Sequence, residues 1–325
     1  MNEKLRVTII THSEELPPMN CTSFFHSTDL FRIVEKTPGQ QPYMVIVRRG
    51  DHIVAHMLAT LRRRGSWIPP YLFTQGRVYG EGEYEMGEDK SALFELMLKA
   101  ITRKLLRRLC LYIEFSDLSQ KMFGYRILRN EGYFPVQWME IHNSLHSMSP
   151  EERITPKTLQ RIQHAQEAGV VFKEVDTEEE FHSFYRMLSR FFTMKIRRYL
   201  PPKKMFELLN ATNHACLFVT KHKNKVIGSC CCVYSHNNAY LWYMASKRKS
   251  YPTLHPSAVT IWGTINHAYK QQRWHIYFMD VGLPFKKNHH RDFILRFGGK
   301  EVGTYRWFRF SLPWINKMIG WFYRE

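Results

Sequence analysis

The order of secondary-structure signals repeats along the chain, and this repeat constrains the fold more than any other feature. Each half begins with a strand and a helix, followed by antiparallel hairpins and a long amphipathic helix. Each half is then completed by one strand, a short helix, a glycine-containing turn and a last strand. The strand after the long helix moves by 165 residues, from Leu109 to Trp274, and the closing glycine by 166, from Gly132 to Gly298. The sequence therefore predicts two copies of one α/β module.

Local signals place the elements of each copy. Gly50-Asp51 and His236-Asn237-Asn238 are typical hairpin turns because Gly and Asn tolerate positive φ. Long helices are predicted over the following ranges: Ser91–Arg107, Thr155–Gly169, Phe181–Lys195 and Pro256–Gln272. The segment Ser144–Thr155 is rich in Ser, His, Pro and Glu and reads as a boundary. We expect domains at residues 1–148 and 149–325, each with a mixed central sheet flanked by helices.

Composition narrows the partners and the compartment. The 47 Lys and Arg residues exceed the 29 Asp and Glu residues, giving a net charge of +18 and predicting attraction to polyanions. No apolar run reaches the ~18 residues of a membrane-spanning helix, and Met1–Arg6 does not read as a signal peptide. The run Cys230-Cys231-Cys232 fits strand residues of a reducing compartment, so the cytoplasm is the expected location.

Metal-ligand spacing is absent from the sequence. The six cysteines form no CxxC pair, so zinc-finger and thioredoxin-like readings fail. His289-His290 has no third ligand at a suitable spacing, and the other histidines are scattered. We expect no metal site.

Three segments of the second half carry a family resemblance. They are Arg161-x-x-x-Ala165-x-x-x-Gly169-Val170, Phe278-Met279-Asp280-Val281-Gly282, and the run from Arg291 through Phe293 and Arg296 to Phe297-Gly298-Gly299. In order and spacing they resemble motifs of the Fem-type aminoacyltransferases and related bacterial double-GNAT acyltransferases. The resemblance covers about residues 155–310, and the first half agrees only in its layout. It implies tandem GNAT-like (acyl-CoA N-acyltransferase) domains.

The resemblance implies a function and leaves alternatives open. The chain would move an acyl or aminoacyl group from acyl-CoA, or from aminoacyl-tRNA, to an amine acceptor. That acceptor would be a small or nucleotide-linked molecule, with a cell-envelope precursor as one candidate. Acyl-CoA would be a co-substrate, and no tightly bound cofactor is expected. The main alternative is a double-GNAT scaffold that has lost its chemistry. A nucleic-acid module ranks last because no RRM, zinc-finger or helix-turn-helix signature accompanies the charge, and no DNA partner is expected.

Two departures from the family pattern affect the expected chemistry. The signature lysine, held in relatives to stabilise transition-state charge, is Ile294 here, and the family aspartate falls on Tyr277. Losing one donor to a developing oxyanion typically costs a hundredfold or more in rate. Candidates to replace that positive charge are the following nearby residues: Arg291, Arg296, Lys286 and Lys287.

The catalytic candidates each have a structural alternative. Asp280, just past a strand, is the candidate base, with a turn aspartate as the alternative. Tyr243 is the candidate proton donor to the leaving group, although core packing would also explain it. Arg291 is the candidate charge stabiliser. Lys157 and Arg161 lie four apart on one helix and could hold an anionic acceptor, with Phe293 beside it, or could be solvated.

Two loops are candidates for binding the phosphates of the donor. Arg77-x-x-Gly80-x-Gly82 matches a pyrophosphate-binding pattern, but the acids that follow would repel phosphate, so a glycine-rich surface turn is favoured. The basic run Lys247-Arg248-Lys249 precedes a predicted helix and is the more credible phosphate site, with Arg296 as a further contact.

The C-terminal segment predicts an amphipathic helix. It places the following residues on one face: Trp314, Ile315, Met318, Ile319 and Phe322. This face could dock onto the protein body or rest on a membrane surface, which would make the protein membrane-peripheral.

Overall fold

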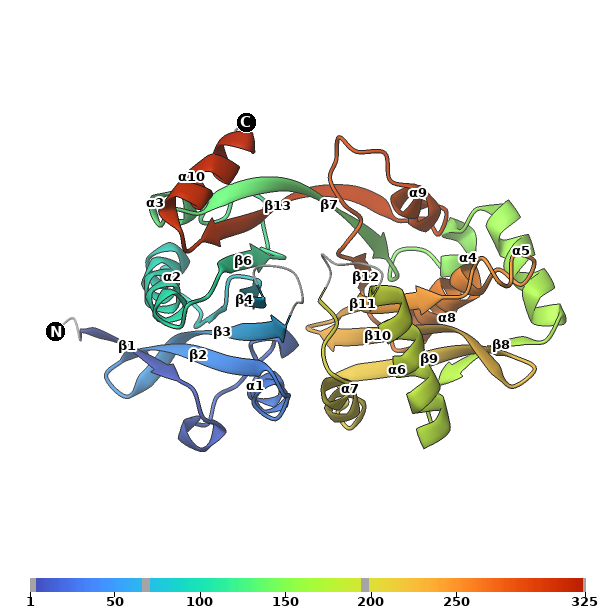
Figure 1. Ribbon diagram of the computed structural model, residues 1–325, viewed down its shortest axis with the longest axis horizontal. Helices are drawn as coiled ribbons and strands as arrows, with labels where there is room; N and C mark the ends of the chain where they lie inside the picture. Colours follow the sequence, from blue (N-terminus) through green and yellow to red (C-terminus); the bar gives the residue numbers. More distant parts are fainter. Residues whose placement is uncertain (1–3, 66–70, 194–198, 324–325) are drawn as a thin grey trace. The chain divides into compact units, whose positions relative to one another are not determined.

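The computed structural model describes residues 4–65, 71–193 and 199–323 and divides the chain into two compact units (Figure 1). The first unit comprises Met1–Trp138 and Gly303–Glu325, and the second comprises Met139–Val302. The division expected at 148/149 gave the C-terminal segment to the second domain, whereas the structure places it in the first. Each unit is described by itself.

The first unit is built on a mixed sheet. Its strands are β1 (Leu5–Ile10), β2 (Gln40–Arg49), β3 (His52–Gly65), β4 (Leu72–Tyr79), β5 (Glu83–Tyr84), β6 (Tyr112–Ser116), and parts of β7 (Phe134–Ser144) and β13 (Lys300–Phe310). The order is β1-β2-β3-β4-β6-β13-β7, and the short β5 pairs with β3. The pair β4–β6 is parallel, whereas β1–β2, β2–β3, β3–β4, β3–β5 and β6–β13 are antiparallel.

Two of the helices of the first unit, α1 (Thr28–Glu35) and α2 (Lys90–Arg107), begin at side-chain caps. The unit also has α3 (Tyr125–Asn130) and α10 (Pro313–Phe322), with 3-10 turns at Ser13–Glu15 and Phe24–His26. The Asp89 carboxylate caps α2 by accepting hydrogen bonds from two backbone amides, and the Ser27 hydroxyl caps α1 by accepting one from the amide of Leu30. The apolar face of α2 packs into a core that includes Phe94, Met97 and Ile101.

The second unit repeats this plan. Its strands are β8 (Val170–Glu174), β9 (Ala215–His222), β10 (Lys225–Ser235), β11 (Asn238–Ser246) and β12 (His275–Phe278). They continue from β7 in the order β7-β12-β11-β10-β9-β8. Again one pair, β11–β12, is parallel, and the other neighbours pair antiparallel. The hairpin turns expected at Gly50 and His236 are confirmed, each with a positive φ.

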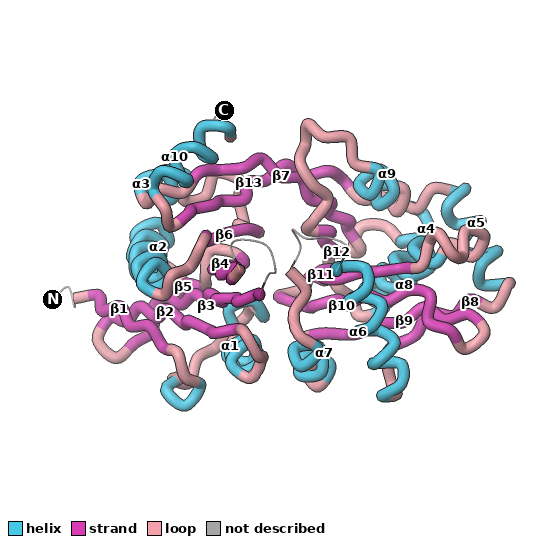
Figure 2. Tube along the Cα trace, viewed as in Figure 1, coloured by secondary structure: helices cyan, strands magenta, loops and turns pink. Residues whose placement is uncertain are grey.

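Two layers of helices cover the sheet of the second unit (Figure 2). The helices are α4 (Pro150–Arg153), α5 (Pro156–Glu167), α6 (Glu178–Thr193), α7 (Lys203–Asn210), α8 (Pro256–Lys270) and α9 (His289–Leu295). Helix α8 packs on the face that carries Cys230 and Cys232. The opposite face contacts α6 and α7 through Tyr243, whose partner across the ladder is Cys231. The end expected for α6 at Lys195 lies outside the described residues.

The closing strands explain why the units are not contiguous halves. Strand β7 ends the first sequence repeat, but its residues 141–144 pair with β12 in the second unit. Strand β13 ends the second repeat, but Trp307–Phe310 pair with β6 in the first unit. The buried Trp307 therefore belongs to the core of the first unit. Backbone pairing and burial place residues 303–325 there, although they follow the second repeat in sequence.

Helix α10 docks through a face different from the expected one. The Asn316 side chain donates to the carbonyl of Gly132 and accepts from the amide of Phe310. Ile315 and Ile319 are half-buried, whereas Trp314 is 64% and Phe322 70% exposed. The expected single face of five apolar residues is thus divided between contact with the first unit and solvent. Among the described residues, no helix has the length and apolarity required to cross a bilayer.

Candidate functional site

The second unit contains a parallel strand pair that separates along its length. Strands β11 and β12 pair from Asn238 with His275 to Tyr240 with Tyr277. Strand β11 then continues to Ser246, and no described residue beyond Tyr240 pairs with β12. Because β11 remains paired with β10 on its other side as far as Ser246, it is a supported strand with one edge free of ladder bonds to β12. Such an edge can bind an extended ligand through backbone hydrogen bonds.

A β-bulge accompanies this separation. In the β10–β11 ladder, Cys231 pairs with Tyr243 but Cys232 pairs with Leu241, so Trp242 is an extra residue. A bulge bends its strand and increases the local twist. The extra residue lies two positions after Tyr240, the last residue of β11 that pairs with β12, so the bend begins close to the end of that pairing.

A basic loop follows the part of β11 that extends beyond its pairing with β12. Lys247, Arg248 and Lys249 are all exposed in the turn between β11 and α8. His255 precedes α8 with φ +40, and Pro256 occupies its first turn. The hydroxyls of Ser246 and Ser257 lie 2.6 Å apart, which ties the start of the loop to the start of the helix. The loop therefore combines three cations with a helix N-terminus, where amide groups and the helix dipole favour an anion.

Helix α5 adds positive charge near this helix start. Burial lowers the pKa of His255, and the nearby Arg161 and His164 lower it further. The predicted acceptor-binding residue Arg161 is therefore close enough to His255 to act on it electrostatically. Lys157 is exposed one turn earlier on α5. The structure thus brings Arg161 near the start of α8, which the basic loop precedes.

A strip of histidines, tyrosines and one acid lies beside the last ladder pair. In the sheet register, Tyr277 is opposite both Tyr240 of β11 and His142 of β7. The ring of Tyr277 lies 4.3 Å from the ring of His142 and 5.0 Å from that of Tyr240, centroid to centroid. The His142 Nε2 atom is 3.1 Å from a carboxylate oxygen of Glu140. This carboxylate is buried, whereas the imidazole is partly exposed, so Glu140 can orient a ring that still reaches solvent.

His275 extends the strip by one position. Its ring stacks on that of Tyr277 at 5.8 Å and meets that of His146 edge-on at 5.1 Å, centroid to centroid. Burial lowers the pKa of His275, with further lowering from the positive charges of His146, His142 and Arg153. A histidine with a lowered pKa stays neutral to lower pH. The strip therefore provides imidazoles that can accept protons next to the point where β11 and β12 part.

The predicted catalytic residues are not all gathered at this point. Asp280 is partly buried two residues after β12. Tyr243 is buried on the face of the sheet that α6 and α7 cover. Its ring lies 5.4 Å from that of Phe206 and 5.8 Å from that of Phe192, so it packs as a core residue.

Arg291 is engaged in holding a loop. Its Nη1 donates to the carbonyl of Leu283 at 3.0 Å and its Nη2 to that of Lys286 at 3.3 Å. Its Nε lies 3.0 Å from a carboxylate oxygen of Glu301. These contacts assign the guanidinium to the segment after β12 rather than to a developing negative charge.

Ile294 stands where the family has its signature lysine, and it and its neighbours have structural roles in α9 and the core. Ile294 is 1% exposed and lies in the apolar core of the second unit. The ring of Phe293 meets that of Phe297 edge-on at 5.5 Å. Arg296 caps the C-terminus of α9, where its side chain is exposed and its carbonyl accepts from the amide of Thr155. A lysine at position 294 would place a charge in the core, which explains why an apolar side chain fits there.

The glycine loop of the first unit has its backbone amides engaged. The Gly80 amide donates to the carbonyl of Ser116, and the Gly82 amide donates to His26 Nε2. Arg77 is buried, pairs with Glu114 and donates to the Ser116 hydroxyl. The preference for a structural turn over a phosphate loop therefore agrees with the geometry.

Sequence reasoning missed Glu140, His142 and His275. A signal for the first two was present, because Glu140, His142, Ser144 and His146 alternate with apolar or amide residues at a period of two. Such alternation is typical of one polar strand face. Its meaning depended on the pairing of β7 with β12, residues that are far apart in the sequence.

Comparisons with known proteins agree with this architecture. Residues 157–287 match the acetyltransferase (GNAT) domain family. FemX superposes with a TM-score of 0.62 at 9% identity, covering 95% of this chain and 96% of its own. A tandem GNAT protein of the clavulanic acid biosynthesis pathway gives 0.58 at 12% identity, covering 95% and 99%. The C-terminal domain of a putative lysylphosphatidylglycerol synthetase from Agrobacterium fabrum gives 0.55 at 9%, covering 80% and 85%.

No curated protein sequence matches the chain. The expected resemblance to Fem-type and double-GNAT proteins and the expected α/β fold are confirmed. The matched GNAT segment lies wholly within the second unit and includes β11, the basic loop, α8 and β12. Residues 157–287 are thus similar to the acetyltransferase (GNAT) domain family, and the chain has the tandem GNAT fold.

Proposed function

We propose that the second unit transfers an acyl group from an acyl thioester, acyl-CoA in the first instance, to an amine. The observation that carries this proposal is the separated β11–β12 pair, with a basic loop at one end and the histidine strip at the other. The match of residues 157–287 to the GNAT family supports it.

The basic loop would bind the phosphates of the donor. Lys247, Arg248 and Lys249 would contact the diphosphate from the side chains, and the N-terminus of α8 from the backbone. Arg161 adds positive charge near the same helix start. The amide-bearing arm of coenzyme A would then lie along the free edge of β11, where it can exchange backbone hydrogen bonds as a further strand does. Arg296 and Lys157 remain predicted contacts of the donor and acceptor.

His142 is the base that we assign to the transfer step. The amine nitrogen attacks the thioester carbonyl carbon, a C–N bond forms, and the C–S bond breaks. The proton lost by the amine passes to the imidazole of His142, whose position is held by Glu140 at 3.1 Å. Asp280 is a second candidate for this role. The sulfur leaves as a thiolate, which takes a proton from solvent. Because a thiol has a pKa of about 8.5, it leaves without a dedicated acid.

The leaving group also favours a thioester over the ester of aminoacyl-tRNA. Expulsion of an alkoxide from an ester requires a proton donor, and the predicted donor, Tyr243, packs among aromatic rings. Aminoacyl-tRNA remains the alternative donor, since the basic surface suits RNA phosphates.

The acceptor that we propose is an amine on a small or nucleotide-linked molecule. An envelope precursor is one such class, because one structural neighbour is described as a lysylphosphatidylglycerol synthetase domain.

The six cysteines are all free thiols, which supports a reducing, cytoplasmic location.

A donor-exchange assay tests the proposal. The purified chain is incubated separately with acetyl-CoA and with aminoacyl-tRNA, each against a panel of amino sugars, polyamines and amino acids, and products are followed by mass spectrometry. We expect acylated amine and free thiol in equal amounts with acetyl-CoA. Transfer from aminoacyl-tRNA alone would replace the donor. Tight binding of acetyl-CoA with no turnover on any amine would support the scaffold alternative and overturn the proposed activity.

A further inference from the structure

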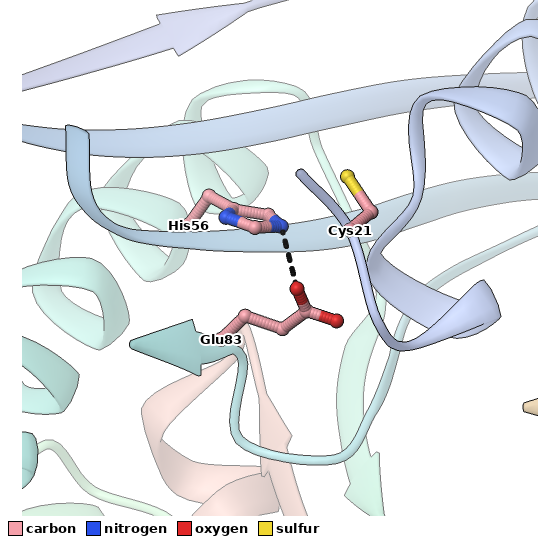
Figure 3. A group of neighbouring side chains, drawn as sticks. All are labelled: Cys21, His56 and Glu83. Carbon is pink, nitrogen blue, oxygen red and sulfur yellow. Dashed lines mark ion pairs between the residues drawn. The ribbon is translucent and has the colours of Figure 1, made fainter. Parts of the chain in front are cut away.

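A cysteine, a histidine and a glutamate meet in the first unit, outside the elements used above. His56 on β3 and Glu83 on β5 are direct partners in the antiparallel ladder. Cys21 belongs to the loop before α1 and faces the same point (Figure 3). One ligand atom from each side chain lies within 4.8 Å of the other two. The three side chains come from separate segments that only the fold brings together.

His56 presents a buried nitrogen to this point. The residue is 5% exposed, and its Nε2 lies 3.5 Å from a carboxylate oxygen of Glu83. No described residue forms a hydrogen bond with this Nε2. A buried polar atom of this kind costs free energy unless something binds it.

The surrounding hydrogen bonds hold the other groups in place. The carboxylate of Glu83 accepts from the Thr22 amide at 3.1 Å and from the Thr22 hydroxyl at 3.2 Å, and also from the Ser23 amide. A backbone hydrogen bond to His26 orients the ring of His56. Ligand side chains of metal sites are commonly oriented by outer hydrogen bonds of this type.

Gly82 allows the two strands to meet. Its φ is +103, and a Cβ built there would lie 2.7 Å from the carbonyl oxygen of His56. A larger residue would therefore push β5 away from β3 and move Glu83 from His56. The close approach of β5 to β3 therefore requires glycine at position 82, directly beside the Cys21, His56 and Glu83 side chains.

A second group of similar composition provides a contrast. Glu174, Cys216 and His267 of the second unit also lie within reach of one another. There, however, His267 Nε2 is 2.9 Å from Glu174 and its Nδ1 is 2.7 Å from the hydroxyl of Tyr234. Both ring nitrogens have partners, so this group is a completed hydrogen-bond network. Only the His56 nitrogen is left to bind something further.

We propose that Cys21, His56 and Glu83 bind one zinc ion. Sulfur, imidazole nitrogen and carboxylate oxygen are the three ligand types that zinc accepts, and a water would complete a tetrahedron. Cys21 is partly exposed, which gives the ion access from solvent. The ion would fasten the loop before α1 to the β3–β5 pair.

Metal titration of the full chain tests this site. The protein is stripped with a chelator, dialysed, and titrated with zinc chloride, with bound metal measured by elemental mass spectrometry. We expect one zinc ion per chain and an increase in melting temperature on binding. The variants Cys21→Ser and His56→Gln should weaken zinc by more than the roughly 10–100-fold that loss of an outer partner costs. Cys216→Ser, the matched change in the second group, should bind as wild type.

Cobalt gives a second readout that does not depend on stability. Co²⁺ bound to a thiolate produces a near-ultraviolet charge-transfer band, which we expect in the wild type and in Cys216→Ser but not in Cys21→Ser. Because Cys21 is partly exposed, serine at this position should leave the fold intact, which circular dichroism verifies. No zinc binding by the wild type, or equal binding by Cys21→Ser and the wild type, would overturn the proposal.

Discussion

The two units contain the same parallel strand pair in two different states. In the first unit, β4 and β6 pair from Gln75 with Tyr112 to Tyr79 with Ser116, and the next amide, that of Gly80, still bonds to Ser116. In the second unit, β11 and β12 pair over three residues, and β11 then continues without its neighbour. One repeated element is thus closed along its length and the other is open.

The charged side chains at the two strand pairs also differ, because they are buried at the closed pair and exposed at the open pair. At the closed pair, Arg77 and Glu114 are both buried, and Arg306 of β13 lies 3.6 Å from Glu114. At the open pair, the charges are the exposed Lys247, Arg248 and Lys249 after β11, and the His142 and His275 rings beside Tyr277 are partly exposed. Equivalent strands therefore pair over five residues in the first unit, whereas in the second unit they pair over three and β11 continues beyond its pairing with β12.

The largest effect is expected from His142→Gln at the open pair. Loss of a general base should lower kcat about 10²–10⁴-fold, while the Kd for acyl-CoA stays near that of the wild type. Steady-state kinetics with a donor-binding measurement will separate the two effects. His222→Gln, a partly exposed histidine at the end of β9, is the matched control. Equal kinetics for both variants would remove His142 from the reaction and direct attention to Asp280.

Arg77→Met at the closed pair should affect stability and not ligand binding. Removing Arg77 takes away the nearer positive charge and leaves the buried Glu114 with Arg306 at 3.6 Å. The expected cost is therefore towards the lower end of about 3–5 kcal/mol of unfolding free energy. Urea denaturation measures this cost, and isothermal titration measures the Kd for acyl-CoA. Weaker donor binding with unchanged stability would show instead that the Arg77 loop is the phosphate site, and would reverse the comparison.

The same pair predicts a pH dependence. Burial alone would raise the pKa of Glu114, but the charges of Arg77 and Arg306 lower it overall. A carboxyl whose folded pKa is lowered contributes stability that is present above its unfolded pKa, about 4.3, and is lost as the pH falls through its folded pKa. The wild type should therefore lose stability below about pH 4. Glu114→Gln should lose less over that range, which thermal melts at a series of pH values will show.

Local signals allowed much of the fold to be predicted from the sequence. Gly50 and His236 mark hairpins, and Pro156 and Gly169 bracket α5, because these residues act on their own backbone dihedrals. The exchange of β7 and β13 could not be read in this way. It depends on pairing between residues more than a hundred positions apart, and no local dihedral preference encodes such a partner.

The candidate site follows the same division. The run Lys247–Lys249 was visible because adjacent charges need no fold to be noticed. His142 was missed because its partners Tyr277 and Glu140 acquire meaning only through the β7–β12 register. Ile294 shows the opposite error: a position that carried the family resemblance lies in the core, where its side chain contributes to packing.

Charge reversal of the basic loop should have a moderate effect. The triple variant Lys247→Glu, Arg248→Glu and Lys249→Glu should weaken acyl-CoA binding by about tenfold, because exposed ion pairs contribute only ~0.2–1 kcal/mol each. The loss should shrink as salt is added, since exposed charges are screened. Titrations at low and high salt check both expectations.

A control triple carries the same charge change elsewhere in the second unit. Lys223, Lys225 and Lys270 are exposed and lie at the β9–β10 turn and the end of α8. Their reversal to glutamate should leave the Kd almost unchanged. If both triples weaken binding equally, the overall charge attracts the donor and the loop has no specific role.

The smallest effect on acyl transfer is expected from changes in α10, because this helix belongs to the first unit and takes no part in the β11–β12 pair. We propose that its exposed Trp314, Trp321 and Phe322 rest on a membrane surface, since Asn316 already fixes the opposite side to the unit. Replacing the three aromatic residues by serine should change the unfolding free energy by no more than about 0.5 kcal/mol. It should leave transfer to a water-soluble amine unchanged but abolish sedimentation with anionic vesicles. Replacing Met86, another exposed apolar residue of the first unit, by serine should leave vesicle binding intact. If the triple variant still sediments as the wild type does, α10 is only a docked helix, and the partners of the first unit must be sought elsewhere on its surface.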